Sequence, residues 1–390
     1  MTPADDSWTW REMAGAFADL GVLVPIAVAL IVTNGLSPTA VLLPAGLLYL
    51  SVAALYRLPV AVQPLKAFGA IAIAKGLGVD VIAAGALLMG AIFVTLGASG
   101  AIDLAAKAFP RPLIRGVQLT VGLLFLKIAF TLVTEPPTSF IDHTTPQPWL
   151  IGLTLACIVL ALALRRLPIA LALVVVAAVA IGWRADLSAW GPSAISLPQI
   201  GAGTLATAFV VLVIPQVPLT FANSCLATAD AARTYFGDAA RAVRPGRLAV
   251  SLGVANLVAG SLSGMPVCHG AGGMTAHQAF GARSWRAPAL IGTTLLVLAV
   301  AVGGGLATLL AAFPIPILAG LLGVAGLLHI ALLRDLEKPI HWAMAIGIGL
   351  VGFLTNLAIA LGAGLVLWWA VVWIRRTRSH RATSQITIGK

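Results

Sequence analysis

The stretch Leu58-Pro59-Val60-Ala61-Val62-Gln63-Pro64 decides the fold, because a short helix that ends near Gly76 follows it directly. Together they are too short to cross a membrane as one helix. A proline-bearing extended stretch at membrane depth leaves backbone groups unpaired, which is tolerated only where protein or an aqueous cavity satisfies them. The sequence therefore predicts a broken membrane helix, a kind of segment that forms binding sites in transporters.

A second stretch of the same kind, Met265-Pro266-Val267-Cys268-His269-Gly270, introduces another short helix that ends near Gly281. Further along each half comes a matching proline-rich phrase, at residues 108–116 and 312–320. The offsets between the halves are 207 residues (58 to 265) and 204 residues (108 to 312). Two phrases in register favour two copies of a seven-span unit over a chance match. Because seven is odd, the second copy must be inverted in the membrane, as in many secondary carriers.

The composition is typical of a protein embedded in lipid. Of the 390 residues, 60% are hydrophobic and 9% are charged, whereas a soluble domain carries about 25% charged residues. Apolar runs of about 20 residues recur from Gly15 to Ile374, and each can cross the hydrocarbon core. We expect an all-α polytopic membrane protein with about fourteen spans, at 15–36, 39–57, 60–77, 79–99, 112–134, 149–165, 167–184, 204–232, 246–263, 266–282, 287–312, 315–333, 339–355 and 357–374. Residues 1–200 form the first repeat, 201–376 the second, and 377–390 a cytoplasmic tail.

The distribution of the net charge of +11 predicts the orientation of the chain. Lys and Arg cluster in alternate loops, with Lys75 and Arg184 as exceptions, and the loop 135–148 holds two acids and no Lys or Arg. Positively charged loops stay in the cytoplasm, so we expect a bacterial inner (plasma) membrane protein with both termini cytoplasmic. The charge is topological and does not argue for nucleic acid. The first apolar run lacks a small-residue cleavage site, which favours a retained helix over a signal peptide.

Gln63 and Lys66 are the candidate ligands of the first half. Pro64 suits a first helical turn, where its missing N–H costs nothing. The free N–H groups and the positive dipole end of the helix that follows favour an anion. Lys66 adds a full charge one turn in, and Gln63 adds an amide donor. Lys66 could instead reach a membrane surface or neutralise an acid, but a lysine at mid-membrane is functional by default.

The matching stretch of the second half begins at His269 and is rich in glycine. Gly270, Gly272 and Gly273 have no β-carbons, so an anion could approach successive N–H groups there. Close helix packing is the alternative use of glycine in membranes. His269 could donate to the anion, carry a coupling proton, or cap the strand.

Three uncharged polar residues open the second half. Gln216, Thr220 and Asn223 follow one another at i, i+4 and i+7, which predicts that they share one helical face. Such groups can order an oxyanion without the desolvation cost of further charges. Hydrogen bonding between helices explains any one of them, but three on one face near Pro215 and Pro218 favour the lining of a cavity.

The remaining polar residues carry weaker signals. Asp19 could neutralise Lys66 or take a coupling proton, and an interfacial cap is the equal alternative. The other embedded polar residues more often bond across helices than touch substrate, and we leave them outside the site: Gln118, Lys127, Asn256, His277, His329 and Asn356. The three cysteines (Cys157, Cys225 and Cys268) have no CxxC spacing and carry no metal or disulfide signal. We expect no metal and no cofactor.

At these segments the sequence resembles a known family. Residues 59–67, Pro-Val-Ala-Val-Gln-Pro-Leu-Lys-Ala, resemble the first signature of the molybdate transporter family. Residues 215–224, Pro-Gln-Val-Pro-Leu-Thr-Phe-Ala-Asn-Ser, look like its second, and residues 15–21 are similar to its opening. The match spans nearly the whole chain. It implies the fold of the sulfate permeases and nucleobase carriers, in which a core domain moves against a gate domain.

The resemblance also implies a substrate held between the two half-helices, with roles for Gln63, Lys66 and the polar residues of 216–223. The chain departs from the family pattern at Leu65, where methionine is frequent. It also departs at Ala67, where a small hydroxyl residue is frequent, so only the backbone N–H of Ala67 is left to contact substrate. Homologues of this fold often form dimers, so a homodimer is one expectation beside membrane lipid and the oxyanion as partners.

The preferred hypothesis is therefore a secondary carrier that imports molybdate by alternating access, with proton symport offsetting the charge of the dianion. Sulfate, as another tetrahedral dianion, is the nearest alternative. A nucleobase carrier is disfavoured, because its site usually holds a carboxylate where Lys66 and Gln216 lie here. A passive anion channel stays open. An enzyme is disfavoured, because His269 and His277 have no acidic partner and no HExxH-type pattern occurs.

Overall fold

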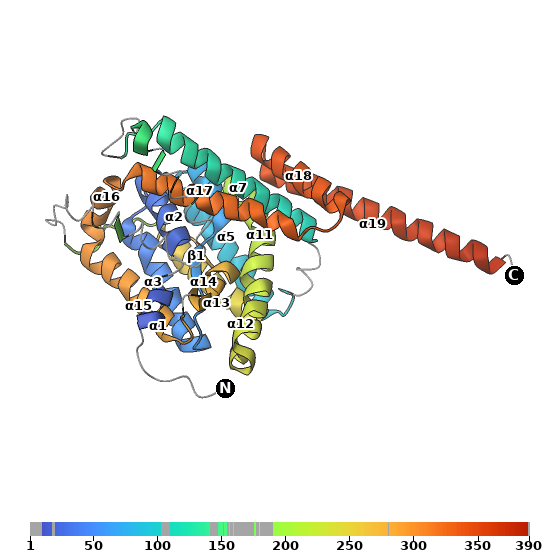
Figure 1. Cartoon of the computed structure of the whole chain (residues 1–390), viewed down its shortest axis with the longest axis horizontal. Coiled ribbons are helices and arrows are strands. Elements are labelled where there is room, and N and C mark those ends of the chain that lie inside the picture. The colour runs from blue at the N-terminus through green and yellow to red at the C-terminus, as the bar shows by residue number, and fades with distance from the viewer. Residues whose placement is uncertain are drawn as a thin grey trace.

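A computed structural model of the chain shows a bundle of helices from which the last helix projects (Figure 1). The structure describes residues 10–17, 20–102, 110–140, 147–150, 190–279 and 281–388, together with residues 152–153, 156, 159, 175–176 and 179. Asp19 and the expected spans 149–165 and 167–184 lie wholly or largely outside these residues.

The first half has short helices around one strand. Its elements are α1 (Trp10–Ala16), α2 (Leu20–Val32), α3 (Pro38–Tyr56), β1 (Val62–Pro64), α4 (Lys66–Ala74), α5 (Val79–Ala98) and α7 (Arg111–Thr134). The expected span 15–36 is observed as the end of α1 followed by α2. The expected broken segment 60–77 is β1 followed directly by α4.

The second half opens with one long helix of changing geometry. Its parts are α10 (Ala202–Ala208), the π-helical turn η1 (Phe209–Val213), α11 (Ile214–Leu219), the π-helical stretch η2 (Thr220–Ala227), α12 (Thr228–Phe236) and the 3₁₀ helix η3 (Gly237–Ala242). It continues with α13 (Pro245–Ser261), β2 (Val267–His269), α14 (Ala271–Ala279), α15 (Arg286–Val297), η4 (Leu298–Val302), α16 (Gly303–Ala311), α17 (Ile315–Ala331), η5 (Leu332–Asp335), α18 (Pro339–Leu354) and α19 (Leu357–Ile388). Helix α19 runs on past 374, where the last span was expected to end.

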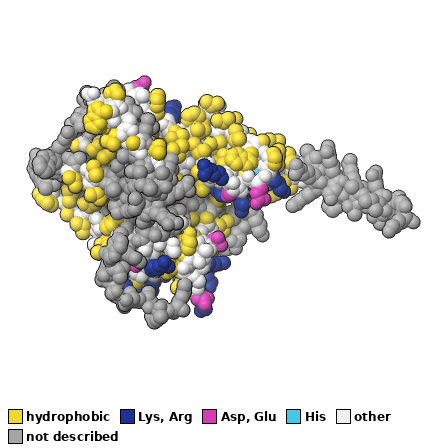
Figure 2. Space-filling view, in the orientation of Figure 1, with side chains coloured by type: hydrophobic (Ala, Val, Ile, Leu, Met, Phe, Trp, Pro, Cys, Tyr) yellow, Lys and Arg dark blue, Asp and Glu magenta, His cyan; other side chains and the backbone are white. Residues whose placement is uncertain are grey.

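Apolar helices dominate the described residues. Six are long and apolar enough to cross a membrane, namely Pro38–Tyr56, Val79–Ala98, Arg111–Thr134, Ala202–Ala242, Arg286–Ala311 and Ile315–Asp335. Three shorter apolar helices accompany them, Val22–Val32, Pro339–Leu354 and Leu357–Trp373. Figure 2 shows hydrophobic side chains over much of the described surface, with charged side chains gathered in a few small groups. Large side chains such as Phe130 and Leu354 are 69% and 74% exposed, as expected where lipid is the solvent.

The two extended stretches meet in the interior. Strands β1 and β2 pair antiparallel, with Val62 opposite His269 and Pro64 opposite Val267. The side chain of Asn256 on α13 also bonds the backbone of Val267, accepting from its N–H at 2.8 Å and donating to its carbonyl at 2.7 Å. This pairing explains how polar backbone is tolerated in the interior of an apolar bundle.

Pairs of glycines bring the long helices into close contact. A β-carbon on Gly90 of α5 would meet the carbonyl of Gly253 on α13, and the reverse also holds. The same reciprocal contact joins Gly46 of α3 to Gly292 of α15. Gly46 and Gly253 lie 207 positions apart, and Gly90 and Gly292 lie 202 apart. A shift of about 205 residues along the sequence therefore places each glycine of one contact at a glycine of the other. Small residues let backbones approach where the hydrophobic effect cannot drive association.

Candidate functional site

Helix α4 begins in the centre of the bundle, next to β1. Lys66 is its first residue, and Leu65 before it supplies no side-chain cap, so the first turn depends on other groups for its free N–H donors. Lys66 is 9% exposed, and its Nζ donates to Oε1 of Gln63 at 2.6 Å. No described carboxylate forms an ion pair with Lys66. The start of α4 therefore holds an ammonium group and a positive helix end with an uncharged partner.

Gln216 on α11 supplies the missing cap from another part of the chain. Its Oε1 accepts the backbone N–H of Phe68 at 2.9 Å, and its Nε2 donates to Oγ1 of Thr220 at 2.9 Å. Gln216 is 1% exposed, and Thr220 is fully buried. The amide therefore fixes the first turn of α4 against the helix that opens the second half, which joins the two halves at the candidate site.

Asn223 does not continue this line of hydrogen bonds. It lies in η2, where the hydrogen bonding is of the π type, and it is partly buried. A π turn holds more residues than an α turn, so Gln216, Thr220 and Asn223 do not lie on one continuous α-helix. That the three side chains face the same cavity stays a prediction. Single π turns inside α-helices are frequent at functional sites.

The start of α14 is built from glycine and lies beside Gln63. A β-carbon on Gly270 would collide with the end of the Gln63 side chain, so any other residue there would have to displace that side chain. Gly272 is exposed, and a β-carbon on it would meet nothing within 4 Å. Gly273, one residue on, is buried. Since β1 and β2 pair, the starts of α4 and α14 come together, with open space at Gly272.

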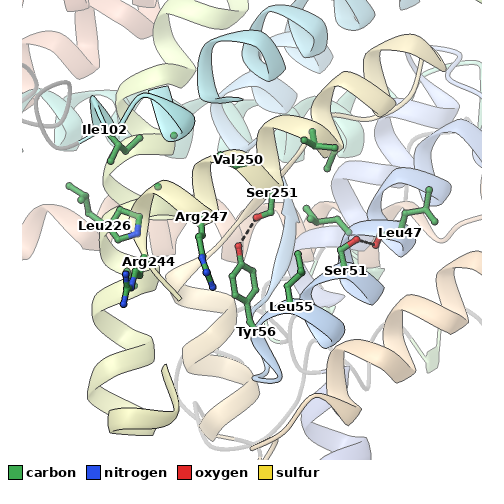
Figure 3. A pocket seen from close by; sticks show the side chains of 18 of the residues that line it. Leu47, Ser51, Leu55, Tyr56, Ile102, Leu226, Arg244, Arg247, Val250 and Ser251 are labelled. Carbon is green, nitrogen blue, oxygen red and sulfur yellow. Dashed lines mark hydrogen bonds between the residues drawn. The ribbon is translucent and has the colours of Figure 1, made fainter. Parts of the chain in front are cut away.

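The His269 side chain points away from Lys66 and Gln63, toward α3 and α13. Its Nε2 lies 2.8 Å from Oγ of Ser251, and its Nδ1 lies 3.3 Å from the carbonyl oxygen of Ala61. Ser251 also bonds the hydroxyl of Tyr56 at 2.8 Å, which Figure 3 shows. Both ring nitrogens therefore have protein partners, and the ring ties β2 to the segment before β1.

The structure thus brings Gln63, Lys66 and Gly270 into one cluster, with Gln216 bonded to the same helix start and Thr220 bonded to Gln216. Ala67 is fully buried. His269 is turned aside, Asn223 lies in η2 with its side chain partly buried, and Asp19 lies outside the described residues. Cys225 and Cys268 are buried, and the described residues hold no group of three or more potential metal ligands.

Sequence reasoning missed two contributors to this arrangement and did not identify the partner of a third. Ser251 and Tyr56 hold His269, and no local pattern marks either of them. Asn256 is one of the residues expected to bond between elements, and it does so, but the element it holds is β2 itself. Asn256 and Val267 are eleven residues apart, and the chain reverses direction between them before β2. A search for helical spacing cannot detect a contact of this kind.

A bundle of membrane helices in which two broken helices start against each other, one of them with a lysine, defines a multi-pass membrane transporter of anions. Solved structures with this fold include the transmembrane domain of a cyanobacterium bicarbonate transporter BicA, with a TM-score of 0.66 and 17% identity over 90% of this chain and 96% of that one. Another is the murine Solute Carrier 26 family member A9 anion transporter in the inward-facing state, with a TM-score of 0.66 and 14% identity over 95% and 69%.

The chain belongs to the molybdate transporter family. The family described as molybdate transporter of MFS superfamily matches residues 11–125 and 208–328, which together exceed half of the chain and include both broken helices. Molybdate transporter 1 of Arabidopsis thaliana is 28% identical over 93% of this chain and 88% of its own length. Molybdate transporter 1 of Chlamydomonas reinhardtii is 28% identical over 95% and 96%. The family resemblance is confirmed, and these relatives are transporters and not enzymes.

Proposed function

We propose that the chain imports molybdate across a bacterial inner membrane by alternating access, with both termini in the cytoplasm. The observation that carries the proposal is the position of Lys66. It is the first residue of α4, it is nearly buried, and it lies where the positive end of α4 adjoins the glycine-rich start of α14. An ammonium group, amide donors and two helix dipoles together suit a small dianion.

The site we propose contains Gln63, Lys66, Gln216, Thr220 and the backbone of 270–273, with Ala67 contributing its N–H and Asn223 approaching from η2. Gln63 and Lys66 bond each other in this structure, so an oxyanion that binds Lys66 exchanges this contact for its own. The lysine charge then meets a full negative charge instead of an amide dipole, and this difference drives binding.

We further propose fourteen spans in two inverted repeats, 1–200 and 201–376, followed by the tail 377–390. The antiparallel pairing of β1 with β2 and the exchange of glycine contacts support this symmetry. Alternating access then follows from movement of one group of helices against the other around the paired strands.

Calorimetry on the purified chain tests the site and the substrate together. Wild-type protein is titrated with molybdate in a background of millimolar sulfate, and the titration is repeated with Lys66→Gln. Removing one partner of a buried charge pair is expected to weaken binding by about 100-fold or more. Lys75→Gln, which removes an equal charge at the exposed far end of the same helix, is the control and should bind as wild type does.

The outcomes separate the candidates. Binding that survives sulfate and is lost in Lys66→Gln supports a molybdate site at α4. Binding abolished by sulfate keeps the site and makes the chain a sulfate or general oxyanion carrier. Equal binding by wild type and Lys66→Gln rejects the site, and no heat with either anion from folded protein rejects the oxyanion function.

We also propose that import is coupled to protons, and uptake into vesicles tests this coupling. Saturable molybdate uptake that rises when the outside is acidic is expected of a proton symporter, whereas a passive channel gives flux that neither saturates nor follows the pH gradient. Asp19→Asn and His269→Gln remove the two candidate proton carriers one at a time. The variant that retains uptake and loses its response to the gradient identifies the carrier, and retention of the response in both excludes these two residues.

A further inference from the structure

A large cavity lies away from Lys66 and Gln63. Its volume is about 1350 Å³, and it opens between α3, α12, α13 and the end of α5. Figure 3 shows Arg244 and Leu226 at one end of this cavity, Leu47 at the other, and Tyr56 and Arg247 between them. None of the proposed molybdate ligands lines it. The cavity is therefore distinct from the proposed molybdate site, and we consider separately which ligand it fits.

One end of the cavity is basic. Arg233, Arg244 and Arg247 line it and are exposed, and Asp230 is the one acid among the lining residues, so the lining carries three positive charges against one negative. Neither Arg233 nor Arg247 forms an ion pair with any residue that the structure describes. By contrast Arg241, in the same connection but outside the lining, pairs with Asp238 at 3.2 Å. The cavity thus holds positive charge that the described part of the protein does not neutralise.

The rest of the cavity is apolar and open to the side. Leu47 and Leu55 of α3 and Val254 of α13 line it, with exposures of 42%, 60% and 48%. The lining follows α13 from Arg244 to Val258, which at 1.5 Å per residue is roughly 20 Å. One leaflet of the hydrocarbon core is roughly 15 Å deep. The cavity is therefore long enough for a charged group at the interface and a hydrocarbon chain below it.

We propose that this cavity binds an anionic phospholipid, with its phosphate at Arg244 and Arg247 and an acyl chain along Leu47, Leu55 and Val254. A free oxyanion would gain nothing from the apolar length, and a zwitterionic lipid would leave the excess positive charge unmatched. Basic pockets between membrane helices are known to hold anionic head groups. Both parts of the cavity are satisfied at once only by a molecule that is anionic at one end and apolar along its length.

The test is binding of phosphatidylglycerol, compared with phosphatidylcholine of the same chains, to the delipidated full-length protein by native mass spectrometry. Wild type is expected to retain phosphatidylglycerol preferentially. Replacing both arginines, Arg244→Gln with Arg247→Gln, is expected to weaken phosphatidylglycerol binding roughly tenfold, since each basic residue near an anionic membrane surface contributes to the attraction. Arg241→Gln is the matched control, because it removes the same charge from the same connection outside the cavity, and it should retain the preference.

Val254→Trp fills the apolar part without changing any charge, so it keeps the test decisive if the double arginine variant does not fold. It is expected to lower retention of both lipids. Equal retention of the two lipids by wild type overturns the proposal, as does unchanged phosphatidylglycerol binding in both variants. Competition by inorganic phosphate at the concentration of the lipid also overturns it, because it would assign the arginines to a free anion. Molybdate binding by the same variants is measured separately, because its loss or survival bears on the transport function and not on the lipid.

Discussion

The two broken helices start against each other but are built differently. The start of α4 carries its chemistry on side chains, with Lys66 and Gln63 in direct contact and Gln216 capping the turn. The start of α14 carries no charged side chain, and its glycines leave room for the neighbouring Gln63 at 270 and open space at 272. In a site for a small anion, α4 thus supplies the charged side chain. Helix α14 supplies backbone N–H groups and the open space through which the anion can reach them. An inverted repeat allows this division, because each copy can diverge without changing the shared frame.

The largest expected effect comes from Gly270, the residue at which the start of α14 meets Gln63 beside α4. In Gly270→Ala the new β-carbon collides with the Gln63 side chain and pushes it off Lys66, and overpacking of this kind costs about 1–3 kcal/mol. We expect molybdate affinity to fall by about 150-fold, which is the upper end of that range. Isothermal titration with thermal unfolding of the same sample measures both consequences.

A double variant shows whether the collision is the cause. Adding Gln63→Ala removes the atoms that the β-carbon strikes, so the two substitutions together should cost less than the sum of each alone. If the losses of affinity in the two single variants add up to the loss in the double variant, the collision with Gln63 is not the cause, and Gly270→Ala acts by changing the backbone.

Next in size is the cap that α11 places on α4. Gln216→Leu leaves the N–H of Phe68 buried without its partner, at a cost of about 1–3 kcal/mol, so affinity should fall between about 5-fold and 150-fold. Gln216→Glu keeps an acceptor for that N–H but brings a negative charge to the positive end of α4. It should fold as wild type does and still lose molybdate. Gln118→Leu, another buried glutamine, on α7, is the control for fold damage, and binding by Gln216→Glu would count against a site at this helix start.

The smaller effect lies on the glycine side. A β-carbon at Gly272 meets nothing, so Gly272→Ala should raise stability by about 0.4–1 kcal/mol by restricting the unfolded chain. If the anion approaches the N–H groups there, the same variant should bind molybdate about 5-fold more weakly, within the range for an imperfect hydrogen bond. Gly347→Ala in α18, which is equally unobstructed, should gain stability with no change in affinity. If Gly272→Ala and Gly347→Ala both bind molybdate as wild type does, the start of α14 does not contact the substrate.

Much of this fold follows from the sequence, because the hydrocarbon core dictates the length of each apolar run and proline marks where helices break. The described helices α3, α5, α7, α13 and α17 begin within one residue of the expected spans. The sequence could not give the register of β1 on β2. The two strands lie about 200 residues apart, and many pairings of two short extended segments satisfy the same backbone groups.

The candidate site likewise has one part that the sequence predicts and another part that it does not. Gln63 and Lys66 are three residues apart, and local spacing alone predicts their association. The acceptor for the N–H of Phe68 comes from Gln216, 148 positions away, and no local rule reaches that far. The spacing of Gln216, Thr220 and Asn223 assumes a continuous α-helix, whereas 220–227 is π-helical, and a π turn depends on packing against neighbours as well as on the residues within it. Of the three roles open to His269 from sequence, its bonds to Ser251 and Ala61 support the strand-capping one.

The smallest expected effect tests how β2 is supported behind the site. Ser251 of α13 bonds both Tyr56 and His269, so Ser251→Ala removes two side-chain contacts at about 0.5–1.5 kcal/mol each. Unfolding should move to lower temperature, while molybdate affinity should change by less than about 3-fold, because the α4 side chains that carry the charge are untouched. Ser261→Ala, on the same helix with a bond only to the carbonyl of Leu257, is the control and should leave both quantities unchanged. A large loss of affinity in Ser251→Ala would mean that binding depends on the position of β2 as closely as on Lys66, and the division of labour between the two half-helices would no longer hold.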